Sequence, residues 1–341
     1  TNGTEISDPT NFGLFRLRKK ILERSNIGLI MTNKSSPGYS FNQSYGVDAN
    51  LQFFRYLILY GYHAKTEGPS NNTDNSASRI AVAWRDQFFN TSIYYKRVGE
   101  SFNPELGFIR RTGINELYGT FGVHKELSNQ FMYEINPYVE VNQIEKPTSE
   151  IETQTISAGL DLIFADGARM MNKFTKNREG VYYSFPLYGS QIDTGDYYFN
   201  NYTTYFMSNK SRPISATVGL TGGGFYNGNR RSITLKSLFR IGYRFSMELG
   251  GQRNEISLSD SEFSVNTYSL KIKYNHSINL LNSLYLQYNE AERKLISNVR
   301  INIIHAPLSD LFLVYSDIRD VDKTNSNTGY IALKLTRLFG I

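Results

Sequence analysis

The sequence has no cysteine and no long apolar run, and each absence removes a class of protein. Without thiols, neither a disulfide framework nor a thiolate metal site can form. A transmembrane helix needs about 20 consecutive, mainly apolar residues. No such run occurs, and the mean hydropathy is −0.40. The sequence therefore excludes disulfide-stapled domains and proteins that span a membrane with helices.

Histidine is also scarce, and positive charge is modest. The four histidines, His63, His124, His276 and His305, lie far apart and show no metal-ligand spacing, so we expect no metal. The net charge of +6 is spread over 341 residues, and its Lys and Arg residues alternate with apolar ones instead of forming a basic stripe. This distribution does not favour nucleic acid as a partner.

Motifs for catalysis are missing as well. The chain has no Gly-x-Ser-x-Gly, no phosphate-binding loop and no His-Glu-x-x-His. The glycine run 222–224 is not followed by a helical pattern, so we assign it to a hairpin loop. We therefore expect a protein that is not an enzyme and that uses no cofactor.

What the chain does have is alternation of apolar and polar residues, repeated along nearly its whole length. In the segment 267–275, Tyr268, Leu270, Ile272 and Tyr274 alternate with polar residues. Successive side chains of a β-strand point to opposite faces, so this segment has one apolar and one wet face. A chain built of little else, and rich in Tyr (25) and Phe (22), is typical of an outer-membrane β-barrel with an apolar outside and aromatic girdles.

The alternation predicts nineteen antiparallel strands, within an expected 18–20, in a single domain that covers residues 1–341. The predicted strands are 12–20, 26–33, 43–53, 55–65, 78–88, 91–99, 114–125, 129–145, 151–164, 168–178, 195–209, 213–223, 231–239, 242–252, 263–275, 281–290, 294–305, 310–318 and 328–338. Residues 1–11 are expected to form a loop or leader. No signal peptide is recognisable at the start, and an exported protein needs one, so we expect that the gene product begins upstream of Thr1.

Connections between the predicted strands alternate between short and long. Long polar loops are predicted at 34–42, 66–77, 100–113, 146–150, 179–194, 224–230, 253–262 and 319–327. With nineteen strands, the first and the last run in the same direction. Bacterial single-chain barrels usually have an even number of strands. We therefore expect the barrel to be completed by further upstream strands or by another chain.

Polar residues at the inward positions of the strands are candidates for lining a lumen. They are Arg79, Arg85, Glu134, Glu140, Arg244, Glu248, Arg300 and Lys334. Their charges are mixed in sign. The plainer interpretation is a network of ion pairs that neutralise one another, and the alternative is a ladder that selects a substrate.

Two loops carry more apolar residues than a freely solvated loop would. The loop 100–113 contains several apolar residues and the pair Arg110 and Arg111, and the segment 179–194 is rich in Tyr and Phe. Exposed aromatic residues are costly in water, so we expect these loops to fold inward as a constriction or to meet a partner. Packing of loop against loop and stacking on sugars are both open for the aromatic segment.

Five segments carry a resemblance to a known family. They are SNIGL at 25–29, YGVDAN at 45–50, NPELGFIRR at 103–111, GDYYFNNY at 195–202 and PLSDLFLVY at 307–315. Through them the chain resembles the C-terminal barrel of a domain-of-unknown-function family of outer-membrane proteins, whose members often carry an N-terminal module similar to carbohydrate-binding family nine. The resemblance implies an upstream module and upstream strands. It supplies no catalytic residue, and sugar binding by that module cannot be transferred to any residue here.

These observations predict a porin-like protein of the Gram-negative outer membrane. We expect either a transport channel or the membrane-embedded component of a larger envelope complex. Expected partners are outer-membrane lipid and either other protein chains or an upstream fragment of the same gene product, with carbohydrate as a further class. The alternatives are a barrel-anchored carbohydrate-binding or hydrolytic protein and a soluble all-β binding protein.

Overall fold

The polar and apolar alternation produces strands throughout the computed structural model. It describes residues 9–38, 40–69, 73–127, 129–322 and 327–338. Residues 1–8 of the expected leader, and parts of the long loops 66–77 and 319–327, lie outside the described residues. Within the described ranges, no helix is long and apolar enough to cross a membrane.

The described residues contain 22 strands, and nineteen of them have nine residues or more. The strands are β1 (Asn11–Leu22), β2 (Ser25–Ser36), β3 (Ser40–Phe53), β4 (Leu57–Glu67), β5 (Ser76–Arg85), β6 (Phe89–Val98), β7 (Ile114–Val123), β8 (Lys125–Glu126), β9 (Met132–Glu145), β10 (Ile151–Phe164), β11 (Arg169–Val181), β12 (Phe185–Leu187), β13 (Ser190–Ile192), β14 (Gly195–Met207), β15 (Ile214–Phe225), β16 (Gly228–Ile241), β17 (Phe245–Ser257), β18 (Glu262–Asn275), β19 (Leu280–Asn289), β20 (Lys294–Ala306), β21 (Ser309–Asp320) and β22 (Asn327–Leu335). Each predicted strand overlaps one of the nineteen long strands.

Three predicted loops are too long, because the strands that flank them extend further than expected. The ladder between β2 and β3 continues to the pair Ser36 and Ser40, within the predicted loop 34–42. The ladder between β15 and β16 continues to the pair Phe225 and Gly228, within the predicted loop 224–230. The ladder between β17 and β18 continues to Ser257 and Glu262, within the predicted loop 253–262. At the ends of β15, β16 and β17 the positions of the apolar face hold glycine or polar residues, such as Gly224, Arg231 and Glu255, so the alternation ends before the hydrogen-bonded ladder does.

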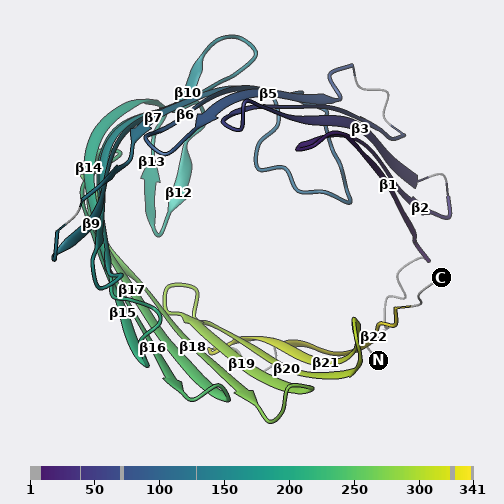
Figure 1. Cartoon of the computed structure of the whole chain (residues 1–341). Helices are drawn as coiled ribbons and strands as arrows, with labels where there is room; N and C mark the ends of the chain where they lie inside the picture. Colours follow the sequence, from purple (N-terminus) through teal and green to yellow (C-terminus); the bar gives the residue numbers. More distant parts are fainter. Residues whose placement is uncertain (1–8, 39, 70–72, 128, 323–326, 339–341) are drawn as a thin grey trace. The chain divides into compact units, whose positions relative to one another are not determined.

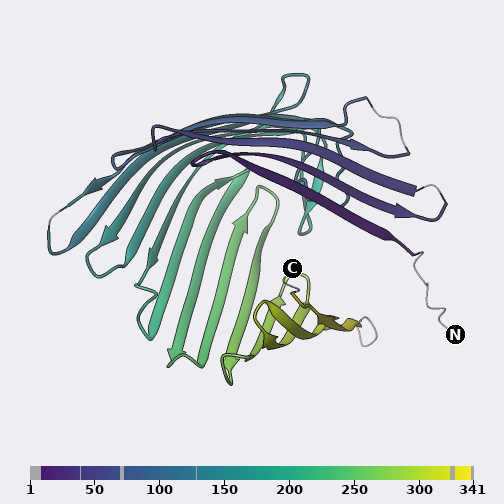
Figure 2. The same cartoon turned by 45° about the vertical axis from the view of Figure 1, so that its right-hand side comes forward.

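Neighbouring strands pair in chain order and antiparallel. The ladders run from β1 through β7 to β9, and from β14 through β22. Twenty strands belong to one sheet, and β12 and β13 form a separate small ladder. Figure 1 labels the strands, and in Figure 2 the green strands of the second half run side by side. An all-β antiparallel sheet is therefore established.

The chain divides into two compact units. The first comprises residues 1–125, 136–158 and 176–181, and the second comprises residues 126–135, 159–175 and 182–341. The boundaries cut across β9, β10 and β11 and do not fall in a linker. The single-domain prediction stays a prediction.

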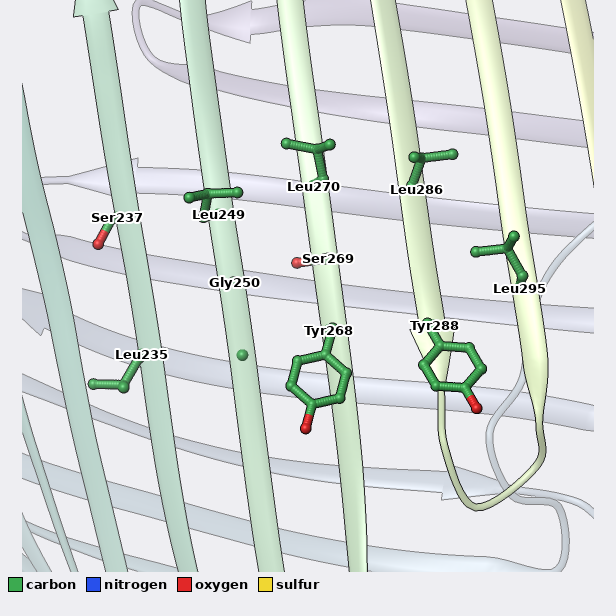
Figure 3. Close-up of a pocket in the computed structure, with 11 residues that line it drawn as sticks. Leu235, Ser237, Leu249, Gly250, Tyr268, Ser269, Leu270, Leu286, Tyr288 and Leu295 are labelled. Atoms are coloured by element: carbon green, nitrogen blue, oxygen red, sulfur yellow. The ribbon is translucent and has the colours of Figure 1, made fainter.

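The sheet has an apolar face and a polar face. The register between neighbouring strands places the apolar residues of one strand beside those of the next, and the polar residues likewise. Leu270 of β18 lies opposite Leu249 of β17 and Leu286 of β19, whereas the next residue, Lys271, lies opposite Glu248. Figure 3 shows the leucines side by side on the apolar face, near Tyr268 and Tyr288 of the same face. A shallow hollow of about 440 Å³ occupies this face.

Most large apolar side chains are exposed. Among the described residues, only nine hydrophobic residues are buried. By contrast, Ile80 is 66% exposed, Ile93 54% and Leu235 53%, all on the apolar face. Soluble monomers rarely expose contiguous apolar patches of more than a few hundred Å². The fold therefore needs an apolar environment around one face of its sheet.

Aromatic residues gather at one end of the strands in the first unit, around the turn from β5 to β6. The ring centroids of Tyr56 and Trp84 are 5.8 Å apart, and those of Phe89 and Phe121 are 5.9 Å apart. Asp86 organises this turn by accepting hydrogen bonds from the backbone N–H groups of Phe88 (2.7 Å) and Phe89 (2.5 Å). Such a band matches the aromatic girdles that flank the apolar belt of membrane barrels.

The Asp86 turn gives a prediction about pH. The N–H of Phe89, then the indole N–H of Trp84 at 2.7 Å, stabilise the charged carboxylate and lower the pKa of Asp86. The charged Asp86 carboxylate stabilises the turn fully when the pH is above the ordinary pKa of an aspartate. This stabilisation is lost as the pH falls through the lowered pKa of Asp86. Trp84 is the only tryptophan, so its fluorescence should change in acid with a midpoint below that of an ordinary aspartate. Asp86→Asn should abolish this transition, and an unchanged titration in that variant would refute the assignment.

Candidate functional site

A network of tyrosines and charges covers the polar face of β4 to β9 in the first unit. Tyr94 of β6 lies at its centre. The guanidinium carbon of Arg79 is 3.9 Å from the centroid of the Tyr94 ring, and Tyr118 stacks with that ring at a centroid distance of 5.0 Å. Arg79 also lies 5.8 Å from the ring of Tyr60. The arginine is thus held by cation–π contacts on the polar face.

The tyrosine hydroxyls connect this stack to carboxylates. The hydroxyl of Tyr94 donates to Glu116 at 2.7 Å, and that of Tyr118 donates to Glu140 at 2.8 Å. Lys96 forms an ion pair with Glu116. The structure therefore brings together two of the predicted lining residues, Arg79 and Glu140, through tyrosines that join them. In this region two cations, Arg79 and Lys96, lie beside two carboxylates, Glu116 and Glu140, and the ion-pair interpretation of the lining residues stays a prediction.

The loop 99–113, between β6 and β7, folds onto the polar face at one end of these strands. Phe102 is only 5% exposed and packs against Ala77, Val98 and Ile114. Ala77 lies two residues before Arg79 on β5, and Ile114 lies two residues before Glu116 on β7, so both point to the polar face. The loop is therefore fastened on the same side of the sheet as the tyrosine network.

Polar anchors hold the first half of the loop. Asn42 of β3 is buried, and its amide donates to the carbonyl of Asn103 at 2.8 Å and accepts from the N–H of Glu105 at 3.1 Å. Thr66 of β4 accepts from the N–H of Asn103 at 3.1 Å. Lys34 of β2 forms an ion pair with Glu105 at 2.6 Å. Three strands thus hold residues 103–105 of the loop, β3 and β4 through its backbone and β2 through the Glu105 side chain.

The second half of the loop carries the two predicted arginines. Arg111 donates to Thr153 of β10 at 3.0 Å and lies 3.6 Å from Glu152, while Thr153 donates to Glu179 of β11 at 2.8 Å. Arg110 and Phe108 are exposed, Phe108 by 84%. The loop thus presents an exposed tip between two anchored ends. That it narrows a pore stays a prediction.

The aromatic segment 179–194 packs against other loops in the second unit. It contains the hairpin of β12 and β13, where Ile192 is fully buried. Tyr188 contacts Phe263 at a centroid distance of 5.5 Å, and the hydroxyl of Ser190 donates to Asp260 at 2.8 Å. Figure 1 shows the hairpin projecting away from the long strands. Loop–loop packing, one of the two interpretations of this segment, is present.

Three further predicted lining residues are Arg85, Arg244 and Glu134. Arg85 is the last residue of β5, so the predicted strand 78–88 ends three residues too late. Arg244 was predicted within a strand, but it lies in the turn before β17, beside the ring of Tyr243. Glu134 lies on β9.

Three predicted residues lie on the polar face of the second unit. Glu248 of β17 is opposite Lys271. Arg300 of β20 lies 5.2 Å from the ring of Phe312, and Lys334 of β22 is opposite Phe312 in the register.

Sequence reasoning missed several residues that build the site. Tyr94 and Lys96 on β6, and Glu116 and Tyr118 on β7, lie two residues apart and alternate with the apolar side chains of their strands, so alternation could have identified them. Their contacts depend on the register between strands, which one sequence does not specify. Nothing local marks Asn42, which is buried only because the loop covers it.

The described residues contain no group of three or more His, Asp or Glu side chains that could hold a metal ion. The site is instead a rigid polar surface with an anchored loop. Such a surface can contact and orient a solute by stacking, charge and hydrogen bonds.

Comparisons with known proteins add little. No family model and no curated protein matches this sequence. Matching solved structures include in-vitro folded OmpT, an outer membrane protein of Vibrio cholerae in its trimer form. It is 11% identical, with 94% of this chain and 96% of that chain covered and a TM-score of 0.44. A likeness this weak carries no inference about function. The family resemblance of the five segments stays a prediction.

Proposed function

We propose that this chain is the membrane-spanning β-barrel of an outer-membrane protein and acts as a channel. One observation carries the proposal: the exposed apolar side chains alternate with polar ones along strands of nine to fourteen residues. A strand needs about 9–11 residues to cross a bilayer. The apolar face is then covered by lipid, and the polar face lines a water-filled interior.

A soluble all-β protein would place these side chains in a core. The small number of buried hydrophobic residues in the described ranges argues against that alternative. A barrel-anchored hydrolase or carbohydrate-binding protein would need an arranged set of groups at the rim. The Tyr94 network offers stacking surfaces, but its hydroxyls already donate to carboxylates.

The odd number of long strands supports a further part of the proposal. Nineteen strands that alternate in direction leave the first and last running the same way. Among the described residues of the first unit, the ladder of β1 is with β2. In lipid, unpaired backbone groups cost several kcal/mol each. We therefore propose that a strand from upstream sequence, or from another chain, completes the barrel in the outer membrane.

Planar-bilayer recording tests the channel. The protein is isolated from outer membranes with whatever polypeptide co-purifies, so that its barrel is closed. We expect stepwise conductance. A folded protein that inserts and gives no conductance would refute the channel and leave the other expected role, that of a membrane-embedded component of an envelope complex.

A further inference from the structure

The polar face of β16, β17 and β18 in the second unit is strongly basic. Arg240 lies opposite Ser246, which lies opposite Lys273. One row further along the strands, Glu248 lies opposite Lys271. Directly opposed residues on one face have Cβ atoms about 4.5–5.5 Å apart. Three cations and one carboxylate thus share a small area of sheet.

A fourth cation borders this area. Lys236 of β16 lies opposite Gly250, in the row after Glu248. A Cβ atom on Gly250 would lie 2.5 Å from the Ser269 hydroxyl and 3.9 Å from the Lys236 side chain. Gly250 thus lies close against Ser269, and the small residue between Arg240 and Lys273 in the register is Ser246.

These cations are not neutralised as those of the first unit are. Among the described residues, no ion pair joins Lys236, Arg240, Lys271 or Lys273 to a carboxylate. The side chain of Arg240 donates to the backbone carbonyl of Lys210, which carries no charge. In the first unit, by contrast, Lys96 pairs with Glu116, and Arg16 pairs with Asp48 at 2.5 Å. Glu248 offsets one of the four charges.

The side chains enclose a hollow of about 220 Å³. Its lining consists of Leu238, Arg240, Ser246, Glu248, Lys271 and Lys273. The four lysine and arginine side chains around it are exposed and carry amine or guanidinium donors. Like charges held this close repel one another unless an anion lies between them.

We propose that this basic hollow, lined by Arg240, Lys271 and Lys273 and bordered by Lys236, binds small solutes that carry several phosphate groups. Arginine binds phosphate with two parallel hydrogen bonds, and lysine binds it as a point charge. Three or four adjacent cations suit a multiply charged anion better than a single carboxylate. This names the class of solute that the proposed channel would bind. It rests on the proposed function only in one respect, which is that solutes must be able to reach this face.

The phosphate of a lipid headgroup has the same chemistry. The hollow, however, opens on the face opposite Leu249 and Leu270, which the proposed function assigns to lipid. A soluble phosphate compound is therefore the expected ligand, and the experiment includes a lipid arm.

Calorimetric titration of the folded protein in zwitterionic detergent with inorganic tripolyphosphate tests the proposal without requiring an open pore. We expect saturable binding. The triple substitution Arg240→Gln, Lys271→Gln and Lys273→Gln should weaken it by at least about tenfold, because each charge-assisted hydrogen bond contributes strongly. Glu248→Gln should strengthen it. In the lipid arm, micelles doped with phosphatidic acid should not compete with tripolyphosphate.

A matched control removes the same net charge elsewhere. Lys65→Gln, Lys146→Gln and Arg212→Gln remove three cations that already pair with Glu67, Glu150 and Asp166. This variant should bind tripolyphosphate within about twofold of the parent, since distant exposed charges are screened. Equal weakening by both triple variants, an absence of saturable binding or competition by phosphatidic acid would overturn the proposal. A failed conductance experiment would leave this result unaffected.

Discussion

Replacing Phe102 with alanine should release the loop 99–113 from the polar face. The Phe102 ring is 5% exposed, and its removal leaves a cavity between Ala77, Val98 and Ile114. Phe→Ala changes at such sites cost about 3–5 kcal/mol. We expect faster amide hydrogen exchange throughout the loop, with the β5 and β6 ladder still protected. If the loop narrows a channel, single-channel conductance should also become larger and noisier.

The same loop supplies the control. Phe108 is the same residue type but is 84% exposed, so Phe108→Ala creates no cavity and should leave hydrogen exchange in the loop unchanged. Equal exchange rates in the two variants and the parent protein would show that Phe102 does not fasten the loop.

Replacing Leu270 with arginine should destabilise the folded protein in lipid. Leu270 lies on the apolar face between Leu249 and Leu286. An arginine on the lipid face of a membrane barrel costs about 2–4 kcal/mol near the bilayer midplane. Denaturant unfolding of the protein in lipid vesicles should show this loss in the free energy of unfolding.

A matched arginine on the polar face tests the register. Gln287 lies on β19, opposite Ser269 and one residue from Leu286. Gln287→Arg should change the free energy of unfolding by less than about 1 kcal/mol, because its side chain can reach water. Similar losses from Leu270→Arg and Gln287→Arg would contradict the assignment of the two faces.

Strand positions were predictable because an apolar face and a polar face of the same sheet impose a period of two. Where that contrast ends, the prediction fails. Arg230 and Arg253 belong to long strands, but the apolar-face positions around them hold glycine or polar residues, such as Gly224 and Glu255, so the sequence predicts a loop there. The hairpin of β12 and β13 was missed because its strands have only three residues each, too short to show a period.

The candidate site was predictable only in part. The alternation of side chains between the two faces of each strand identified Arg79 and Glu140. The large number of apolar residues in the loop 100–113 identified the loop that carries Arg110 and Arg111. Which strand residues meet, such as Tyr94 with Tyr118, follows from the register between strands and from side-chain packing. Anchors far apart in sequence, such as Asn42 and Glu105, depend on the loop's path across the sheet.

The most direct test of the two-faced sheet is a scan of residues 267–275 on β18. The chain has no cysteine, so single cysteines can be introduced one at a time and spin-labelled in lipid vesicles. We predict that collisions with lipid-soluble oxygen are frequent at Tyr268, Leu270, Ile272 and Tyr274, and that collisions with a water-soluble nickel complex are frequent at the positions between them. Equal accessibility at successive positions, or alternation of the opposite phase, would contradict the membrane-spanning barrel.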